Sequence, residues 1–195
     1  TSATASSDDM YCVYLGQALQ TVNPPNASVG TAQLADSSVT SAKLGTGATN
    51  TPAFEAHSNA GQSLSDNTYA KVALQTEVLD TDSNFDNSSN YRFTPTTAGK
   101  YYFEGHVRTS GSNQSSLRNS YAAIYKNGSF YKEARNNFGD NDIRESSVSV
   151  SAILDMNGSS DYVELYAAAD VVSGSPSLLE GTKANYFLGY KIIGA

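Results

Sequence analysis

The sequence predicts an all-β domain, a sandwich or barrel of about eight to ten strands, in which no segment makes a convincing helix. Short runs of alternating apolar and polar residues recur after residue 52, with turn signals between them. The chain of 195 residues contains 13 Tyr and 7 Phe but no Trp, and only 16% of its residues are charged. Because aromatic residues favour strands while Ser, Thr, Asn and Gly favour polar turns, this composition indicates the same fold class.

The predicted strands are organised around residues 91–103, where a short apolar run leads through a turn into an aromatic strand. The turn contains a proline, which cannot donate a hydrogen bond to a sheet, and Gly99, which can adopt the positive φ of a sharp corner. Beyond it the period is two, so Tyr101 and Phe103 share one face and Tyr102 lies on the other. Such a strand is expected between its own core and a second packed surface.

Further strands follow from the same criteria. The clearest hairpin signal is Asn127-Gly128, which suits a type I′ turn. Residues 69–79 have some helical character, but their β-branched residues and the flanking Asn and Asp favour one long strand with room for a bulge. The predicted strands are residues 54–57, 69–79, 91–93, 100–109, 121–125, 129–132, 146–154, 162–168 and 184–193.

Residues 1–27 are interpreted as an N-terminal anchor. The small polar residues 1–7 are expected to be disordered unless something holds them. Residues 10–19 are apolar enough to need cover, so we expect either an attachment segment that packs on a partner, or a short strand or helix laid on the main domain. Two prolines then interrupt any regular structure.

Residues 28–51 are interpreted as a stalk built on a ten-residue repeat. Residues 28–37 align with residues 38–47, with Ser, Val, Ala and Leu in the same places. Two such units bury little alone, whereas three parallel chains could pack their apolar residues about one axis. The repeats resemble the fibrous segments of bacteriophage tail and head fibres; the alternative is a Ser/Thr/Ala-rich linker with chance similarity. The residues expected to pack in the stalk are Val29, Leu34, Val39 and Leu44.

Several short motifs follow one another in residues 52–195. The most specific is Phe93-Thr-Pro95-x-x-Ala98-Gly99-x-Tyr101-x-Phe103; the others include Phe54-x-Ala56, Lys71-Val72-x-Leu74, Ile124-x-Lys126-Asn127-Gly128, Val148-x-Val150, Tyr162-Val-Glu-Leu165 and Tyr186-Phe187-x-Gly189-Tyr190. In this order they resemble the jelly roll of the complement C1q and tumour necrosis factor (TNF) superfamily. Two departures are a longer turn at residues 157–161 and an unusual polar loop at residues 110–119.

The resemblance implies a compact homotrimer whose strands pack about a threefold axis. On that basis Tyr101 and Phe103 are expected to fill the core of each protomer and Tyr102 to lie at the interface; the alternative places Tyr102 in solvent. The stalk differs from collagen because it contains no Gly-X-Y run. The candidates for trimer interface or core are Phe54, Tyr101, Tyr102, Phe103, Phe187 and Tyr190.

Charge and cysteine content exclude several classes of protein. Cys12 is the single cysteine, so the chain can form neither an intrachain disulfide nor a multi-cysteine metal site. The net charge of −7 argues against binding to nucleic acid, which needs a basic surface. No apolar run is long enough to span a membrane and no signal peptide is visible, so we expect no membrane insertion.

The sequence offers little that resembles a catalytic or cofactor site. His57 and His106 are isolated within predicted strands, and no serine motif supplies the nucleophile and acid that a catalytic histidine needs. Neither a Gly-rich phosphate loop nor a two-histidine metal spacing is present. We therefore expect both histidines to be structural, the protein not to be an enzyme, and no cofactor to be bound.

Residues 80–86 begin like a calcium loop, with oxygen ligands at alternate positions. The pattern then departs, because Phe85 stands where the sharp-turn glycine belongs and Tyr91 where the bidentate glutamate belongs. A solvated acidic loop is the simpler interpretation. The weak candidates for a calcium ion are Asp80, Asp82, Asn84 and Asp86.

Three polar loops, at residues 110–119, 136–144 and 172–177, have the Asn- and Ser-rich composition that suits adaptable recognition of carbohydrate or protein. The receptor-facing candidates are Asn113, Asn136, Asn137, Asp140, Asn141 and Asp142.

The leading hypothesis is a non-enzymatic, trimeric fibre protein of a virion, from a phage tail or head, with an N-terminal segment that binds other virion proteins and a jelly-roll head at residues 52–195. The head would bind a host-surface glycan or protein, or cap or decorate the particle. The alternative is a secreted cellular C1q-like, lectin-like module, whose marks would be a signal peptide or collagen-like stalk. A glycan-active enzyme would need two carboxylates about 5–10 Å apart, and the sequence singles out no such pair.

Overall fold

The computed structural model of the chain describes residues 26, 28–44, 49–112, 115–181 and 183–193. They fall into two units, divided between Thr40 and Ser41. The first contains a short 3-10 helix, η1 (Thr31–Gln33), and the second begins with a one-turn helix, α1 (Ser41–Leu44). Among the described residues, no helix is long and apolar enough to cross a membrane. The predicted anchor lies almost wholly outside them, and the boundaries after residues 27 and 51 stay predictions.

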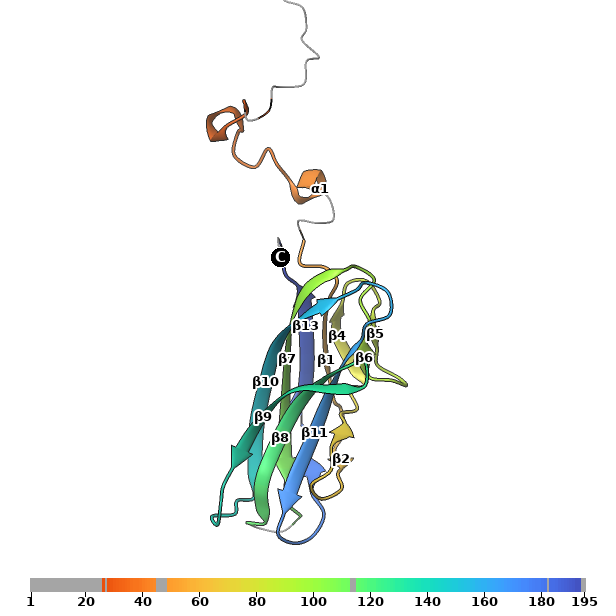
Figure 1. The fold of residues 1–195 in the computed structure, drawn as a ribbon, viewed down its shortest axis with the longest axis vertical. Helices are drawn as coiled ribbons and strands as arrows, with labels where there is room; N and C mark the ends of the chain where they lie inside the picture. The colour runs from red at the N-terminus through yellow and green to blue at the C-terminus, as the bar shows by residue number, and fades with distance from the viewer. Residues whose placement is uncertain (1–25, 27, 45–48, 113–114, 182, 194–195) are drawn as a thin grey trace, which may run out of the picture. The chain divides into compact units, whose positions relative to one another are not determined.

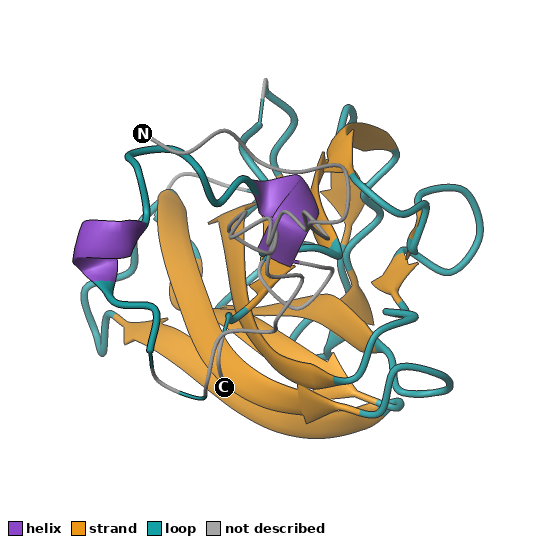
Figure 2. Ribbon diagram, turned by 90° about the horizontal axis from the view of Figure 1, so that it is seen from above, coloured by secondary structure: helices purple, strands orange, loops and turns teal. Residues whose placement is uncertain are grey.

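The second unit is an all-β sandwich of two antiparallel sheets, as predicted (Figure 1). Sheet A runs in the order β2 (Gln62–Ser63), β12 (Ser177–Leu178), β7 (Gly99–Ser110), β13 (Tyr186–Lys191), β1 (Ala53–His57), β4 (Thr76–Asp80), and β10 (Glu145–Met156) also pairs with β7. Sheet B runs in the order β5 (Phe85–Asp86), β6 (Arg92–Phe93), β11 (Val163–Val171), β8 (Leu117–Lys126), β9 (Ser129–Asn137), and β3 (Ala70–Lys71) also pairs with β11. The long strands of the two sheets face one another as in a jelly roll (Figure 2).

Strand β7 is central to sheet A, and its two faces differ as predicted. It pairs with β10 along its whole length and with β13 over residues 101–106. Tyr101 and Phe103 are fully buried on the inner face, whereas Tyr102 lies on the outer face and is partly exposed. Gly99 begins the strand with a φ of +144°, so the predicted positive φ is confirmed.

Aromatic rings from both sheets meet in the core. Phe54 of β1 stacks on Phe93 and Phe85 of sheet B, with ring centroids 4.4 and 4.9 Å apart. Phe187 of β13 packs edge-on against Phe54 at 5.2 Å and stacks on Phe103 at 5.9 Å. Because each such ring buries on the order of 150–250 Å², this cluster contributes much of the apolar burial that holds the sheets together.

The predicted hairpin is confirmed. Asn127 and Gly128 join β8 to β9 with φ values of 53° and 74°, the two positive values that a type I′ turn requires. Both strands are longer than predicted. In particular, residues 117–119 belong to β8 rather than to the preceding loop.

The prediction of one strand over residues 69–79 is wrong. This segment contributes β3 to sheet B and then β4 to sheet A, so the chain crosses from one sheet to the other. Val72 and Leu74, between the two strands, are fully buried. The two-residue strands β2, β5 and β12 were not predicted, because so short a segment shows no alternation.

Candidate assembly face and recognition loops

The outer face of sheet A carries a regular array of aromatic and charged side chains. The registers of β1, β13 and β7 place these residues in rows that cross all three strands. We call this array the sheet A face. Its three rows are Ala53, Tyr190 and Tyr102; Glu55, Leu188 and Glu104; and His57, Tyr186 and His106.

Glu104 lies at the centre of the sheet A face and accepts hydrogen bonds from two phenols. The Tyr102 hydroxyl donates to Oε2 at 3.0 Å, and the Tyr186 hydroxyl donates to Oε1 at 3.1 Å. The hydrogen bond to Glu104 raises the pKa of Tyr102, and burial, followed by the bond to Glu104, raises the pKa of Tyr186. Both phenols therefore stay protonated and hold the carboxylate in place.

His106 packs flat on the Tyr186 ring, with centroids 5.2 Å apart and planes 7° apart. Its Nδ1 lies 3.0 Å from the carbonyl oxygen of Ala184. These contacts describe a histidine held by its surroundings. The Nδ1 atom of His57, in the same row, is buried without a hydrogen-bond partner. The structural role predicted for the two histidines stays a prediction.

The row of the sheet A face that contains Tyr102 is apolar and open. The Tyr102 and Tyr190 rings lie 5.5 Å apart, and Tyr190 is 39% exposed. Ile153 of β10 pairs directly with Tyr102 and is 56% exposed. Tyr102 therefore lies on the face predicted for it, whereas its role at an interface stays a prediction.

The four apolar residues of the repeat segment are also exposed. Val29, Leu34, Val39 and Leu44 have exposed fractions between 45% and 54%. A single chain thus leaves every predicted stalk-packing side chain in contact with water.

The three predicted recognition loops lie together at one end of the sandwich (Figure 1). The Ser175 N–H donates to Ser112 Oγ at 3.0 Å, which joins the third loop to the first. The Gly111 N–H donates to the Arg144 carbonyl at 3.0 Å, which joins the first to the second. The chain enters β1 beyond Pro52 at the opposite end of the sandwich. The loops therefore form one surface, distal to the point of entry.

Two of the receptor-facing candidates occupy a strand. Asn136 and Asn137 belong to β9, where the Asn136 amide donates to Ser146 Oγ and the Ser147 carbonyl, both at 3.0 Å. Asn137 Oδ1 accepts from the Gly139 N–H at 2.8 Å. These side chains brace the end of the sandwich, so they are less free to meet a ligand than the loop residues.

The other receptor-facing candidates lie between β9 and β10. Asp140 and Asn141 are exposed, and Asp142 is partly exposed. Asn113 lies outside the described residues. A receptor-binding role for these side chains stays a prediction.

The acidic loop uses its carboxylates to fix its own backbone. Asp80 accepts from the N–H groups of Asn84 and Phe85 at 3.1 and 2.9 Å, and Asp82 accepts from a neighbouring threonine hydroxyl. Hydrogen bonds from the following turn hold the pKa of Asp86 well below its usual range. In the described part of the chain, no three His, Cys, Asp or Glu side chains group closely enough to hold a metal. A calcium ion here stays the weaker of the two interpretations.

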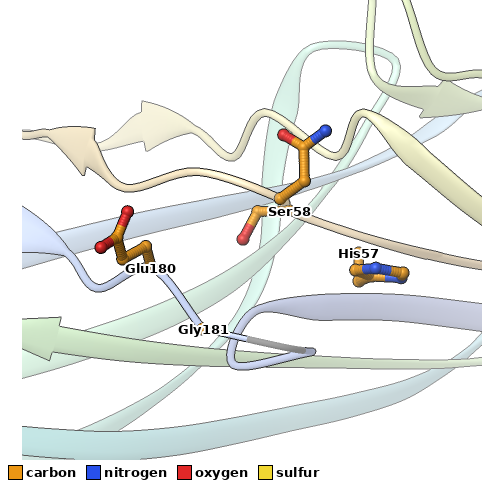
Figure 3. A pocket seen from close by; sticks show the side chains of 5 residues that line it. His57, Ser58, Glu180 and Gly181 are labelled. Atoms are coloured by element: carbon orange, nitrogen blue, oxygen red, sulfur yellow. The ribbon is translucent and has the colours of Figure 1, made fainter.

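A pocket of about 370 Å³ opens beside the end of β1 (Figure 3). Figure 3 shows the His57 ring and the Glu180 side chain on opposite sides of Ser58. The Ser58 hydroxyl accepts a hydrogen bond from the Asn185 amide at 3.0 Å. The pocket is lined by His57, Ser58, Asn59, Glu180 and Gly181.

A second aromatic array, on the outer face of sheet B, was not predicted. We call these five residues the sheet B face. They come from β8, β9, β11 and the residue before β3, so only the strand order brings them together. Period two places the rings of β8 on one side of the strand, but nothing in the sequence indicates their neighbours. The five residues are Tyr69, Tyr121, Tyr125, Phe130 and Tyr166.

Comparison with known proteins identifies the fold through solved structures. No family model and no curated protein matches the sequence. The structure is similar to the Eiger TNF of S. frugiperda (TM-score 0.54, 10% identity, covering 73% of this chain and 93% of that one). It is also similar to the globular domain of zebrafish complement 1qA (TM-score 0.50, 16% identity, covering 72% of this chain and 97% of that one). A third similar structure is murine APRIL (TM-score 0.51, 10% identity, covering 72% of this chain and 98% of that one). At these identities the likeness establishes the fold alone, a TNF- and C1q-like jelly roll.

Proposed function

We propose that this chain is a non-enzymatic, homotrimeric fibre protein of a virion, with residues 1–27 as anchor, residues 28–51 as stalk and residues 52–195 as a jelly-roll head. The observation that carries the proposal is the exposure of all four repeat positions. In a single chain Val29, Leu34, Val39 and Leu44 are each about half exposed, and three parallel chains could bury such apolar side chains against one another.

The sheet A face supports a trimeric head. Apolar Tyr190 and Ile153 are exposed beside Tyr102, while Glu104 is already satisfied by two phenols. An interface can cover such a face without leaving the central carboxylate unpartnered, because the tyrosine hydroxyls remain its donors. The central strand of the sheet would then be packed on both faces.

The loop end supports a role in recognition. Three polar loops meet at the end of the sandwich opposite the entry of the chain. A head tethered through its entry end would present these loops outward, where they could bind a host-surface glycan or protein.

The solution mass tests the assembly. Light scattering of the whole chain is expected to give three times the monomer mass of 20.6 kDa, and the same measurement on residues 52–195 separates head from stalk. A trimer in both would assign assembly to the head. A trimer only with residues 1–51 present would assign it to the repeats, and monomers in both would overturn the fibre proposal.

The recognition role needs a separate test. Purified protein is expected to compete with phage particles for adsorption to host cells. Replacing Asp140, Asn141 and Asp142 by alanine should weaken that competition, whereas unchanged competition would remove this loop from the binding surface.

A further inference from the structure

The sheet B face is a continuous layer of aromatic rings. Tyr125 stacks on Tyr166 with centroids 4.0 Å apart, and Phe130 packs edge-on to Tyr125 at 5.8 Å. The centroid of the Tyr69 ring lies 5.9 to 6.3 Å from the ring centroids of Tyr121, Tyr125 and Phe130. Phe130 is 53% exposed, and the four tyrosines are partly exposed. One surface of the layer therefore meets solvent.

The layer rests on a fixed base. Ala123 and Ala168 point outward from sheet B, opposite the core residues, yet they are 0% and 1% exposed because the rings cover them. Lys71 and Glu164 form an ion pair at 2.5 Å on the same face, and the Glu164 side chain is only 4% exposed. Rings held in this way lose little conformational freedom when a ligand binds.

The charged groups around the rings balance one another. The Tyr69 hydroxyl donates to Glu133, and burial together with that bond raises the pKa of Tyr69. The Arg135 guanidinium lies 6.0 Å from the centroid of the Tyr121 ring. Lys71 is paired with Glu164, and the exposed Glu133 and Arg135 carry opposite charges. The sheet B face therefore offers polar and charged hydrogen-bonding groups beside apolar rings but no net charge. The chemistry that matches it is a neutral ligand with one apolar side.

The size of the layer favours a small ligand. Four partly exposed tyrosines and one half-exposed phenylalanine present roughly 400 Å² of ring surface. A stable protein interface buries about 800 Å² on each partner. One or two sugar rings, each a few ångströms across, would cover the layer, whereas a protein partner would need further apolar surface around it.

We propose that the sheet B face binds neutral sugar rings of a surface glycan. The C–H face of a pyranose would pack on Phe130 and Tyr125, and its hydroxyl groups would exchange hydrogen bonds with Tyr69, Glu133 and Arg135 at the edge. The site lies on the sheet facing away from the sheet A face, so sugar binding does not depend on the fibre proposal.

Saturation-transfer NMR on the whole chain tests the site, with maltose, lactose and diacetylchitobiose as neutral probes and a sulfated disaccharide as the charged control. Transfer from tyrosine and phenylalanine ring protons to at least one neutral probe is expected, and little to the sulfated one. The Phe130→Ala variant should bind that probe about tenfold more weakly, since the loss of one ring contact costs up to roughly 1.4 kcal/mol.

Tyr131→Ala is the matched control. Tyr131 is the next residue of β9 and is 49% exposed, but in the described part of the chain it takes part in none of the ring pairs that form the sheet B face. The Tyr131→Ala variant should bind the neutral probe as tightly as the unmodified chain does. Equal weakening in both variants, binding of the sulfated probe alone, or no transfer to any neutral probe would each overturn the proposal. A monomeric protein that still binds sugar would contradict the fibre proposal while leaving this one intact.

Discussion

At the scale of single residues, Gly189 shows how closely the core is packed. A Cβ at this position would lie 2.5 Å from Phe103 Cδ1 and 2.9 Å from Phe54 Cε1. Both rings belong to the central cluster, so they have little room to move. The glycine in the motif Tyr186-Phe187-x-Gly189-Tyr190 is therefore required by the close approach of two rings.

We predict that Gly189→Ala lowers the free energy of unfolding by about 1–3 kcal/mol, because an extra methyl group overpacks the core. Urea denaturation followed by circular dichroism measures it. Ser149→Ala, at an exposed site on β10, should change stability by less than about 0.5 kcal/mol. A Gly189→Ala variant as stable as the unmodified chain would show that the Phe103 and Phe54 rings can move to accommodate the added methyl group.

A second prediction concerns Asp86 and the stability of the fold at acid pH. Hydrogen bonds from Ser89, Asn90 and Ser88 favour its charged form and hold its pKa below the ordinary value. A depressed pKa stabilises the fold at pH values above the unfolded pKa of about 3.9, and this contribution is lost as the pH falls below it.

The melting temperature should therefore fall as the pH drops below about 4, and Asp86→Asn should make that fall shallower while lowering stability at neutral pH. Thermal melts across this range measure both effects. Asp140→Asn, in the exposed loop after β9, serves as the control and should leave the curve unchanged. A curve for Asp86→Asn parallel to that of the unmodified chain would contradict the prediction.

At the scale of elements, the pairing of β3 with β11 places an ion pair under the sheet B face. Glu164 Oε1 lies 2.5 Å from Lys71 Nζ, and the carboxylate side chain is 4% exposed. Lys71 is 31% exposed, so it reaches solvent where Glu164 does not. Removing the lysine would leave a buried carboxylate without its cation.

We predict that Lys71→Met costs about 2–4 kcal/mol, and that adding Glu164→Gln recovers at least half of this loss. The four proteins of the double-mutant cycle, each unfolded in urea, supply the measurement. A double variant no more stable than Lys71→Met alone would mean that packing, and not the unpaired charge, causes the loss.

The elements that sequence reasoning recovered are those whose signal is local. The alternation in residues 100–109 predicts β7 to within one residue at each end, and Asn127-Gly128 predicts the turn of the hairpin. The prediction of one strand over residues 69–79 failed because the segment passes from sheet B to sheet A part of the way along. Local periodicity reports which residues are buried, and Val72 and Leu74 are buried in either arrangement.

The candidate surfaces divide in the same way. Tyr102 could be assigned to the outer face because its position within β7 determines that face. The sheet B face could not be predicted, since Tyr69 and Tyr166 are separated by almost a hundred residues and share one face only through the pairing of β3 with β11. Asn136 and Asn137 were assigned to a loop because their polar character resembles one, but β9 extends through them.

At the scale of the whole molecule, the sheet A face gives a prediction about assembly. We expect Ile153→Lys to weaken the head trimer, because it places a charge beside Tyr102 and Tyr190 where three copies would meet. Light scattering across a dilution series should show dissociation at a higher concentration than for the unmodified chain. Ser129→Lys, at an exposed position of β9 in sheet B, is the control for added charge. If the Ile153→Lys variant dissociates at the same concentration as the unmodified chain, the interface lies elsewhere.

The separation of the chain entry from the loop end has a mechanical consequence. A load applied between the recognition loops and the tether would act along β1, parallel to its length. Its neighbours on both sides, β13 and β4, are antiparallel to it and hydrogen-bonded over most of its five residues. Shear of this kind strains these bonds together instead of opening them one after another, so the head should resist pulling along this axis far better than peeling from one edge.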